Sequence, residues 1–403
     1  MAQERPKRDV NRFAALREVN YRRFAAGQGV SLVGSWAETV AQGILILSLT
    51  HSPATLGAAV ALRYLPVLLL GPYAGLFVDR HDRRRVLIAT QCVLGAVSAT
   101  FGVVVLTGSA ATWQIFLVAG IFGVVTAADN PARMALIPEL VGEDSLHSAV
   151  TLNSVLANVG RGVGPVLAAG LIGTVGIGWC FVANAASFAV VVVTLLSMQT
   201  GRIHSEGHAG RGPGQVRDAV QIVRSDPQLL APLVMMLFVG TLTYEFEVTL
   251  PVFAERTLHA GAPEYSWLTA CFGIGSIAAG VILLLHPQHG ARRMSYIAAA
   301  YAVALAATSF ASDSIVANAL VILVGACSIA FLVTGNSTIQ LRAPVGMRGR
   351  VTSLWTAAFL GSTPAGGLLI GGAAQAWGGQ AALLIGAGAC VVASVVGWVI
   401  TRR

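Results

Sequence analysis

GPYAGLFVDRHDRRRVL, residues Gly71–Leu87, joins two long apolar segments through a short cluster of charged side chains. Gly71, Ala74 and Gly75 stand three and four residues apart just before the charges, and small residues at this spacing let two helices approach closely within a membrane. The charges that follow, as far as Arg85, mark the point where the chain meets water on one side of that membrane. We therefore expect two spanning helices joined by a turn at the membrane surface.

The composition places the chain in a membrane. Of its 403 residues 55% are hydrophobic and only 11% are charged, whereas a soluble domain is about one quarter charged. The five cysteines fall in apolar stretches without the paired spacing of a metal site or a disulfide framework, so no metal is expected. The sequence contains no nucleotide-binding P-loop, no Gly-x-Ser-x-Gly elbow and no His-Glu-x-x-His pair, so neither an enzyme nor a cofactor is expected.

A spanning helix needs about 20 mainly apolar residues, and the sequence contains twelve such segments, which predicts an all-α integral membrane protein. One long polar connection, 200–228, is Gly-rich and ends in a candidate amphipathic helix. It divides the chain into a tail (1–23), a six-helix half (24–199), the loop itself and a second six-helix half (229–403). The predicted spans are 24–49, 54–78, 86–107, 112–134, 146–173, 177–199, 229–253, 264–286, 293–311, 314–340, 350–374 and 379–400.

The basic residues support this topology. If the N-terminus is inside, 23 of the 26 Arg and Lys residues fall in the tails and loops on that side. Arg256 falls outside, and Arg63 and Arg161 fall within spans. Positive residues gather on the cytoplasmic side of a membrane, so both termini and the central loop are expected in the cytoplasm. The same distribution accounts for the net charge of +8 without a nucleic-acid partner.

The opening loop resembles the loop between helices 2 and 3 of major facilitator superfamily transporters, whose pattern is Gly-x-x-x-Asp-Arg-x-Gly-Arg-Arg. One position departs, because Asp82 stands where that family usually has Gly, although Asp is also a turn residue. The equivalent loop of the second half, 286–293, is a weaker copy without the Asp. Two related six-helix halves are the repeat of this fold. The matching residues are Gly75, Asp79, Arg80, Arg83 and Arg84.

Small-residue motifs in the fifth and eleventh spans extend the resemblance. Gly160, Gly164 and Pro165 resemble the Gly-Pro motif of exporters in this superfamily, and Pro364 and Gly366 stand in a related pattern about 200 residues later. Such residues permit close helix packing and bending. We expect the fifth span to pack through its motif on a helix of the other half.

Two longer stretches resemble a narrower group. DNPARMALIPELV (129–141) and YEFEVTLPVFAERTL (244–258) are similar to bacterial drug and siderophore exporters, including enterobactin-exporter-like and macrolide-efflux-like proteins. The resemblance covers nearly the whole chain. It implies a secondary transporter of the bacterial inner (plasma) membrane that works by alternating access. Its expected partners are a small-molecule substrate, protons and the lipid bilayer, and a monomer is the expected functional unit.

The resemblance also implies a cytoplasmic latch between the halves. Asp79 would meet Arg133 and the start of the eleventh span near Arg350, where a helix N-terminus stabilises a carboxylate. Asp129 and Arg133 are four residues apart, which favours a local ion pair. The loop arginines Arg80, Arg83 and Arg84 leave two roles open: part of this latch, or only fixing the topology.

The first span has a polar face. Its members recur every three or four residues and therefore share one side of a helix. Two interpretations remain: a cavity wall in which Glu38 binds a proton, or an interhelical hydrogen-bond seam. We favour the cavity, because a carboxylate within the membrane is costly and usually functional. The face consists of Gln28, Ser31, Ser35, Glu38 and Gln42.

Two arginines fall inside spans and need a partner. Arg161, on the same face of the fifth span as Asn158, requires a carboxylate, a substrate anion or water. We hypothesise that it faces Glu38 across the cavity of the first half. Arg63 in the second span offers an alternative partner for Glu38 or for a carboxylate of the seventh span.

The seventh span contributes Thr241, Tyr244, Glu245 and Glu247. Its two carboxylates are candidates for proton binding, and the alternative is a water-exposed outer vestibule. Two further candidates are the tryptophans Trp36 and Trp355, which lie deep enough in their spans to stack on a bulky ligand.

These features predict proton-coupled efflux of a small amphipathic molecule, such as a drug, an antibiotic or a siderophore. The direction rests on the resemblance. An importer of a metabolite, sugar or iron-siderophore with the same fold remains open. A membrane receptor or scaffold that transports nothing is a more remote alternative, because packing alone would not require Glu38, Arg161 and Glu245 in the membrane.

Overall fold

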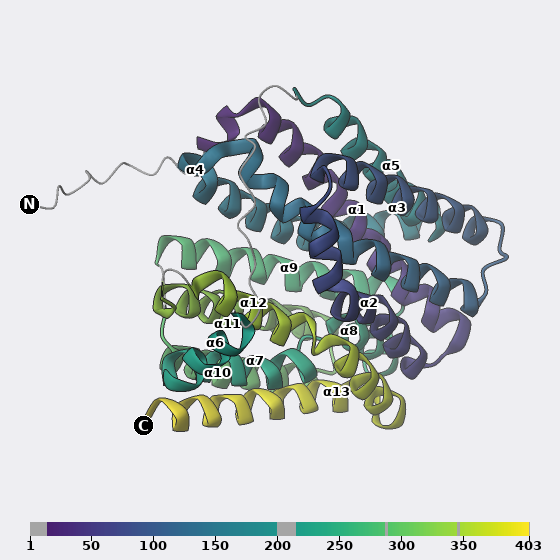
Figure 1. The fold of residues 1–403 in the computed structure, drawn as a ribbon. Coiled ribbons are helices and arrows are strands. Elements are labelled where there is room, and N and C mark those ends of the chain that lie inside the picture. The colour runs from purple at the N-terminus through teal and green to yellow at the C-terminus, as the bar shows by residue number, and fades with distance from the viewer. Residues whose placement is uncertain (1–13, 200–214, 287–288, 345–346, 403) are drawn as a thin grey trace, which may run out of the picture.

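The computed structural model describes residues 14–199, 215–286, 289–344 and 347–402. Within these ranges the chain forms helices and no strand, which confirms the predicted all-α class (Figure 1). A short 3-10 turn, Ala14–Arg17, precedes the first helix. The helices are α1 (Val19–Thr50), α2 (Pro53–Asp79), α3 (Arg83–Leu106), α4 (Thr112–Thr174), α5 (Gly178–Leu196), α6 (Gln215–Ser225), α7 (Pro227–Leu242), α8 (Phe246–Arg256), α9 (Ala262–Leu285), α10 (Ala291–Ser309), α11 (Ser314–Arg342), α12 (Arg348–Leu360) and α13 (Thr363–Arg402).

Two of these helices make two passes each. α4 turns at Gly142 and α13 turns at Gly378, where φ is 67° and 84°, values that only glycine adopts easily. Ten stretches of the described chain are long and apolar enough to cross a membrane, and the last of them, 350–402, contains the turn of α13. With that stretch divided and with α10, which packs beside α11 and α13, the helices account for the twelve predicted spans.

Two predicted spans are interrupted in their middle. The span 229–253 consists of α7 and α8, separated at 243–245, and the span 350–374 consists of α12 and the start of α13, separated at 361–362. A break inside a bilayer is tolerated only where the freed polar groups find partners or line a cavity. Thr243, at the first break, donates its hydroxyl to the carbonyl oxygen of Gly386 at 3.0 Å.

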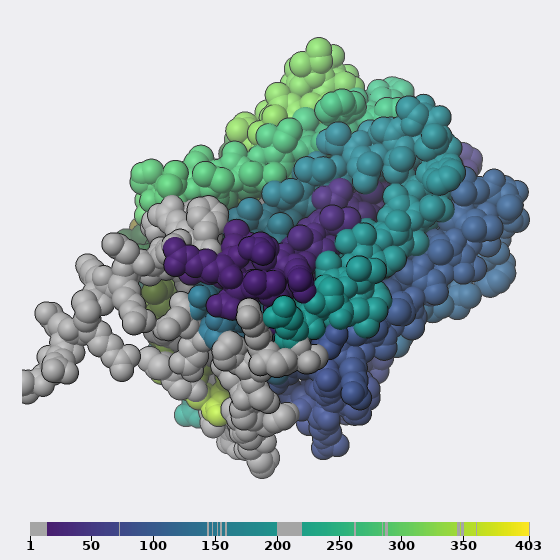
Figure 2. All heavy atoms as spheres, turned by 90° about the horizontal axis from the view of Figure 1, so that it is seen from above, coloured from purple at the N-terminus to yellow at the C-terminus, as the bar shows by residue number. Residues whose placement is uncertain are grey.

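The glycine motif of the fifth span packs differently from the prediction. A Cβ added at Gly160 would lie 2.8 Å from the Leu32 Cβ, and one at Gly164 would collide with Trp36. Both contacts are with α1. This helix lies between α5 and the part of α4 that follows Gly142 (Figure 2). The expected contact with the other half is made by Gly162, which packs on Gly273 of α9. The motif therefore faces α1, not the other half as predicted. A glycine outside the motif, Gly162, makes the contact with α9 instead.

We call the end of the bundle that carries the turn between α2 and α3 the basic end. Asp82 begins α3 there, with φ of −62° and a side chain that accepts a hydrogen bond from the Arg85 amide. No glycine is therefore needed at this position. Arg83 pairs with Glu139 of α4, and Arg84 donates to the last carbonyl groups of α5. The two predicted helices joined by a turn at this end are confirmed.

The opposite end, where α1 joins α2 at 51–52, is called the distal end. Here the two halves touch directly, because Gly57 of α2 packs against the backbone of Gly367 and Gly371 of α13. Arg256, at the end of α8, donates to the carbonyl oxygens of His51, 3.3 Å away, and of Ala374, 3.2 Å away. The distal end is thus closed by backbone contact between α2 and α13, which lie side by side there (Figure 1). One guanidinium group, that of Arg256, also joins both halves.

Replacing Gly57 by Ala should prevent full closure of the distal end, because the added methyl group would overlap the backbone of α13. Spin labels at Ser109 and Ala376, exposed residues of the two halves, should then lie farther apart. The measurement is double electron–electron resonance on a variant without its native cysteines.

Gly170→Ala is the matched control, since a Cβ at that helical position meets nothing within 4 Å. It should leave the distance between the labels unchanged. If Gly57→Ala also left it unchanged, the contact between α2 and α13 would not be what closes this end.

Candidate functional site

A cavity of about 240 Å³ lies between the two halves. Its wall contains three charged side chains, from α4 and from the start of α8, within a surround of aromatic rings and aliphatic groups. It is slightly smaller than most ligand sites, which measure about 300–1,000 Å³. The cavity therefore accommodates a small molecule or one end of a larger one. The lining residues are Trp36, Val60, Tyr64, Arg161, Tyr244, Glu245, Phe246, Glu247, Leu250, Tyr265, Thr269, Phe272, Phe359 and Thr363.

The break between α7 and α8 brings Glu245 to the cavity. The backbone of Glu245 is not helical, and only 2% of this residue is exposed to solvent. The Glu245 Oε1 atom has no hydrogen-bond partner among the described residues. It lies against α13, where a Cβ at Gly366 would be only 2.6 Å away from it. An uncompensated carboxylate at such a depth is costly and marks a functional candidate.

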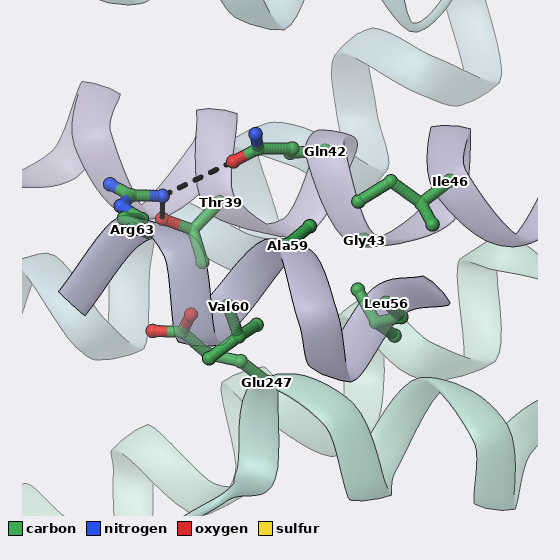
Figure 3. Close-up of a pocket in the computed structure, with 9 residues that line it drawn as sticks. All are labelled: Thr39, Gln42, Gly43, Ile46, Leu56, Ala59, Val60, Arg63 and Glu247. Atoms are coloured by element: carbon green, nitrogen blue, oxygen red, sulfur yellow. Dashed lines mark hydrogen bonds between the residues drawn. The ribbon is translucent and has the colours of Figure 1, made fainter. Parts of the chain in front are cut away.

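Glu247, in the first turn of α8, has a hydrogen-bond partner. The Tyr64 hydroxyl of α2 donates to its Oε1 at 3.1 Å, so this contact joins the two halves. Glu247 also borders a second, much smaller cavity of about 10 Å³, which has room for about one water molecule (Figure 3). Arg63 lies on the far side of that cavity and donates to Gln42 at 3.2 Å and to Thr39 at 3.4 Å.

Arg161 projects from α4 into the main cavity. Its guanidinium carbon is 5.1 Å from the centre of the Trp36 ring, within the range of a cation–π contact. Its Nε atom is buried and has no hydrogen-bond partner among the described residues. Glu247, Tyr64 and Tyr244 line the same cavity.

Glu38 lies elsewhere, in the core of the first half. Its Oε2 accepts hydrogen bonds from Ser98 of α3 at 2.7 Å and from Asn184 of α5 at 2.5 Å. The cation whose charge acts on it is Arg63. The structure therefore does not bring Glu38 and Arg161 together in this conformation, and their pairing stays a hypothesis for another one.

The rest of the polar face of α1 is also enclosed. Gln28 and Ser31 are each 3% exposed, and Ser35 donates to Asn184 at 3.4 Å. Gln42 contacts Arg63 at the small cavity. These contacts correspond to the interhelical seam, the second of the two interpretations that the sequence left open. Proton binding by Glu38 stays a prediction.

Two of the predicted latch residues contact each other directly. Arg133 forms an ion pair with the buried Asp129, as the spacing predicted, and Thr90 donates to the same carboxylate at 2.7 Å. Arg350 donates to the Met347 sulfur at 2.9 Å. The contact of Asp79 with Arg133 and with the α12 start stays a prediction.

The other candidates occupy varied places. Thr241 donates its hydroxyl to Leu237 of its own helix at 2.5 Å, and Tyr244 donates to the Ser328 carbonyl at 2.7 Å. Trp355 is buried against Gly335 of α11, away from the main cavity. The Asn158 side chain lies outside the described part of the structure.

Sequence reasoning missed two groups of residues. The aromatic wall, including Tyr64 and Tyr265, gave no signal because aromatic residues are common in spans. Ser98 and Asn184, which bind Glu38, were detectable in principle, because an amide in an otherwise apolar span such as Asn184 needs a polar partner. The partner itself could not be identified without the packing of three helices.

The fold and this cavity define a membrane transporter of two six-helix halves. The family model described as "transmembrane secretion effector" matches residues 10–402, and the chain belongs to this family of the major facilitator superfamily. The chain is accordingly a multi-pass membrane protein with the fold of this superfamily.

Three curated relatives show the neighbourhood of the chain. It is 22% identical to the staphyloferrin A transporter of Staphylococcus aureus over 64% of its own length and 66% of that protein. It is 31% identical to macrolide efflux protein A of Streptococcus pyogenes, over 36% of each chain. Both matches span less than two thirds of the relative. The enterobactin exporter EntS of Citrobacter koseri is 23% identical over 89% of this chain and 85% of its own.

Solved transporters share the fold. A bacterial homologue of the human lysosomal transporter Spinster, in an inward-facing and occupied conformation, has a TM-score of 0.75 at 14% identity and covers 96% of this chain and 97% of its own. A D-xylose–proton symporter also reaches 0.75 at 14% identity, covering 94% and 97%. At this identity the likeness concerns the fold alone.

Asn184→Leu should destabilise the protein, because the Glu38 carboxylate would lose a buried hydrogen-bond donor. The expected cost is about 1–3 kcal/mol, seen as a lower Tm of the purified protein in detergent. The double variant Glu38→Met/Asn184→Leu should recover part of that loss, since it removes the buried carboxylate and leaves only hydroxyl groups, such as that of Ser98, without this partner. A double variant no more stable than Asn184→Leu would contradict this account of the seam.

Proposed function

We propose that the protein is a proton-coupled exporter of a small amphipathic molecule, working by alternating access in the inner membrane of a bacterium. The observation that carries the proposal is Glu245. It combines a place in a helix break, a cavity between the halves and a buried oxygen without a partner among the described residues. Inverted or parallel repeats with discontinuous helices at the bilayer centre are a common design of substrate and ion sites.

The distribution of basic residues supports an orientation in the membrane. Arg80, Arg83, Arg84 and Arg85 lie at the basic end, and positive residues favour the cytoplasmic side. We therefore assign the basic end and both termini to the cytoplasm. The closed distal end then faces outward, and this conformation is suited to loading the cavity from the cytoplasm.

In the proposed cycle, a proton entering from outside neutralises Glu245. The charged form is costly beside the backbone of α13, so protonation changes the free energy of holding α8 against Gly366. A difference of this kind between two conformations is what shifts their populations. The membrane potential adds about 2.3 kcal/mol per charge per 100 mV to the driving force.

Glu247 and Glu38 are the other proton candidates. Glu247 already accepts a hydrogen bond from Tyr64 across the halves, so its protonation would alter an interdomain contact. Glu38 is held inside one half by Ser98 and Asn184, which makes it a weaker candidate for a step that moves the halves. Asp79 and Arg133 remain our proposed cytoplasmic latch, which would close when the distal end opens.

Export is supported by what the relatives are named for: efflux of macrolides and export of enterobactin. The fold does not decide the direction, because a D-xylose–proton symporter shares it. Import of a metabolite, sugar or iron-siderophore is therefore the second candidate. A receptor without transport activity is disfavoured by Arg161 and Glu245, which each keep a buried polar atom without a hydrogen-bond partner in the described part of the chain.

The direction can be tested in the native organism. Spent medium from a deletion strain is compared by mass spectrometry with medium from the same strain carrying the wild-type gene. We expect at least one amphipathic compound to accumulate outside only when the transporter is present. Retention of that compound inside the complemented cells, rather than the deletion cells, would identify an importer.

The role of Glu245 is tested in proteoliposomes with the compound so found. Glu245→Gln, a mimic of the protonated form, should abolish transport driven by a pH gradient but keep substrate counterflow, which needs no net proton movement. Glu255→Gln, on the last turn of α8 outside the cavity lining, is the control and should keep both activities. Undiminished gradient-driven transport by Glu245→Gln would exclude Glu245 as the coupling residue.

A further inference from the structure

Arg161 and Glu245 differ from Arg63 and Glu247, the other charged residues of the cavity region, in their contacts. Arg63 donates to Gln42 and Thr39, and Glu247 accepts from Tyr64. Arg161 has only the face of the Trp36 ring as a defined contact, while its Nε–H is buried without an acceptor among the described residues. A guanidinium group carries five N–H donors in a rigid fork, so this arrangement leaves strong donors unused inside the membrane.

The cavity wall around Arg161 is rich in aromatic rings. Trp36 lies against the guanidinium group, and Tyr244 and Phe359 stand edge to face with their ring centres 5.2 Å apart. Phe246 and Phe272 contribute a second pair at 4.6 Å. Rings in these positions bind flat or apolar groups and exclude water. In such surroundings a hydrogen bond between a charged donor and an anion is stronger than at an exposed site.

The carboxylates of the wall are less available to a ligand. Glu247 is engaged by Tyr64, and Glu245 Oε1 faces the backbone of α13 at Gly366. A cationic ligand would have to enter beside the guanidinium charge of Arg161. An anionic ligand would instead supply the acceptor that the Arg161 Nε–H lacks among the described residues.

We propose that the cavity selects an organic anion, a molecule with a carboxylate attached to an aromatic or apolar body, and that Arg161 binds its acidic group. The body of the molecule lies among Trp36, Tyr244 and Phe359. This inference rests on the proposed function, because it takes the cavity as the substrate site. Arg161 is then the specificity-determining residue, and the rings set the size and flatness of the rest.

The test uses the purified full-length protein in detergent and three probes of one shape: 2-naphthoate, 2-naphthamide and 2-naphthylmethylamine. Binding is followed by quenching of tryptophan fluorescence. The wild-type protein should bind the acid about tenfold more tightly than the neutral amide, and the amine more weakly than either. Equal affinity for the acid and the amide, or no binding of the acid, would overturn the proposal.

Variants identify the residue responsible. Arg161→Gln should bind the acid and the amide equally, and Arg161→Lys should retain part of the preference because the charge remains. Arg402→Gln is the matched control, since Arg402 also stacks on a tryptophan, with 3.3 Å between its guanidinium carbon and the Trp398 ring centre, but at the basic end. It should keep the full preference. The Tm of each variant is measured as well, and only variants with the Tm of the wild-type protein are compared, so that a loss of folding is not mistaken for a loss of binding.

The outcomes separate this inference from the proposed function. Binding requires neither a proton gradient nor a direction of transport. Acid-selective binding that depends on Arg161 would stand even if proteoliposomes showed no proton-coupled efflux. Arg161→Gln that retained the acid preference would refute the inference and leave the exporter proposal intact. Equal weakening of the acid and the amide would show Arg161 to be a structural counter-ion of Glu247.

Discussion

A backbone inside a bilayer must satisfy its own hydrogen bonds, and the rest of this structure depends on that constraint. Most of the described chain meets it with uninterrupted helices. The two interruptions inside spans, at 243–245 and 361–362, lie in the same half. They also lie beside each other, because Thr241 and Glu245 at the first break touch Gly366 just after the second. The irregular backbone is thus concentrated beside one cavity, where polar groups have a reason to be.

The buried charges divide into two groups by their partners. Glu38 accepts from Ser98 and Asn184, and Asp129 pairs with Arg133 and accepts from Thr90. Such satisfied groups stabilise the packing of helices. Glu245 and Arg161 each keep a buried polar atom without a partner among the described residues. Since a protein gains nothing in stability from an unsatisfied buried charge, these two are where a proton and a substrate have something to bind.

How far the sequence predicted this arrangement depends on which signal each feature leaves. Hydropathy located the twelve spans and the charge cluster located the turn between α2 and α3, because both are properties of local sequence. The break at 243–245 was missed, since the apolar residues on both sides make 229–253 long enough to be interpreted as one span. The polar face of α1 was recognised, but its partners stand on two other helices. A polar face on one helix indicates that its side chains have polar partners, but it does not identify the helices that provide them.

The closure of the distal end and the environment of Glu245 share one helix. α13 contacts Glu245 at Gly366, α2 at Gly367 and Gly371, and Arg256 at its Ala374 carbonyl. Gly366 and Gly367 are adjacent and therefore lie on different sides of α13. Gly366 faces Glu245 at the start of α8, and Gly367 faces α2. A shift of α13 that relieved the first contact would therefore also disturb the second. In the proposed mechanism no long pathway is needed between proton binding and opening, because one rigid helix bears on both, and small displacements of a packed helix are enough to change which of two arrangements is stable.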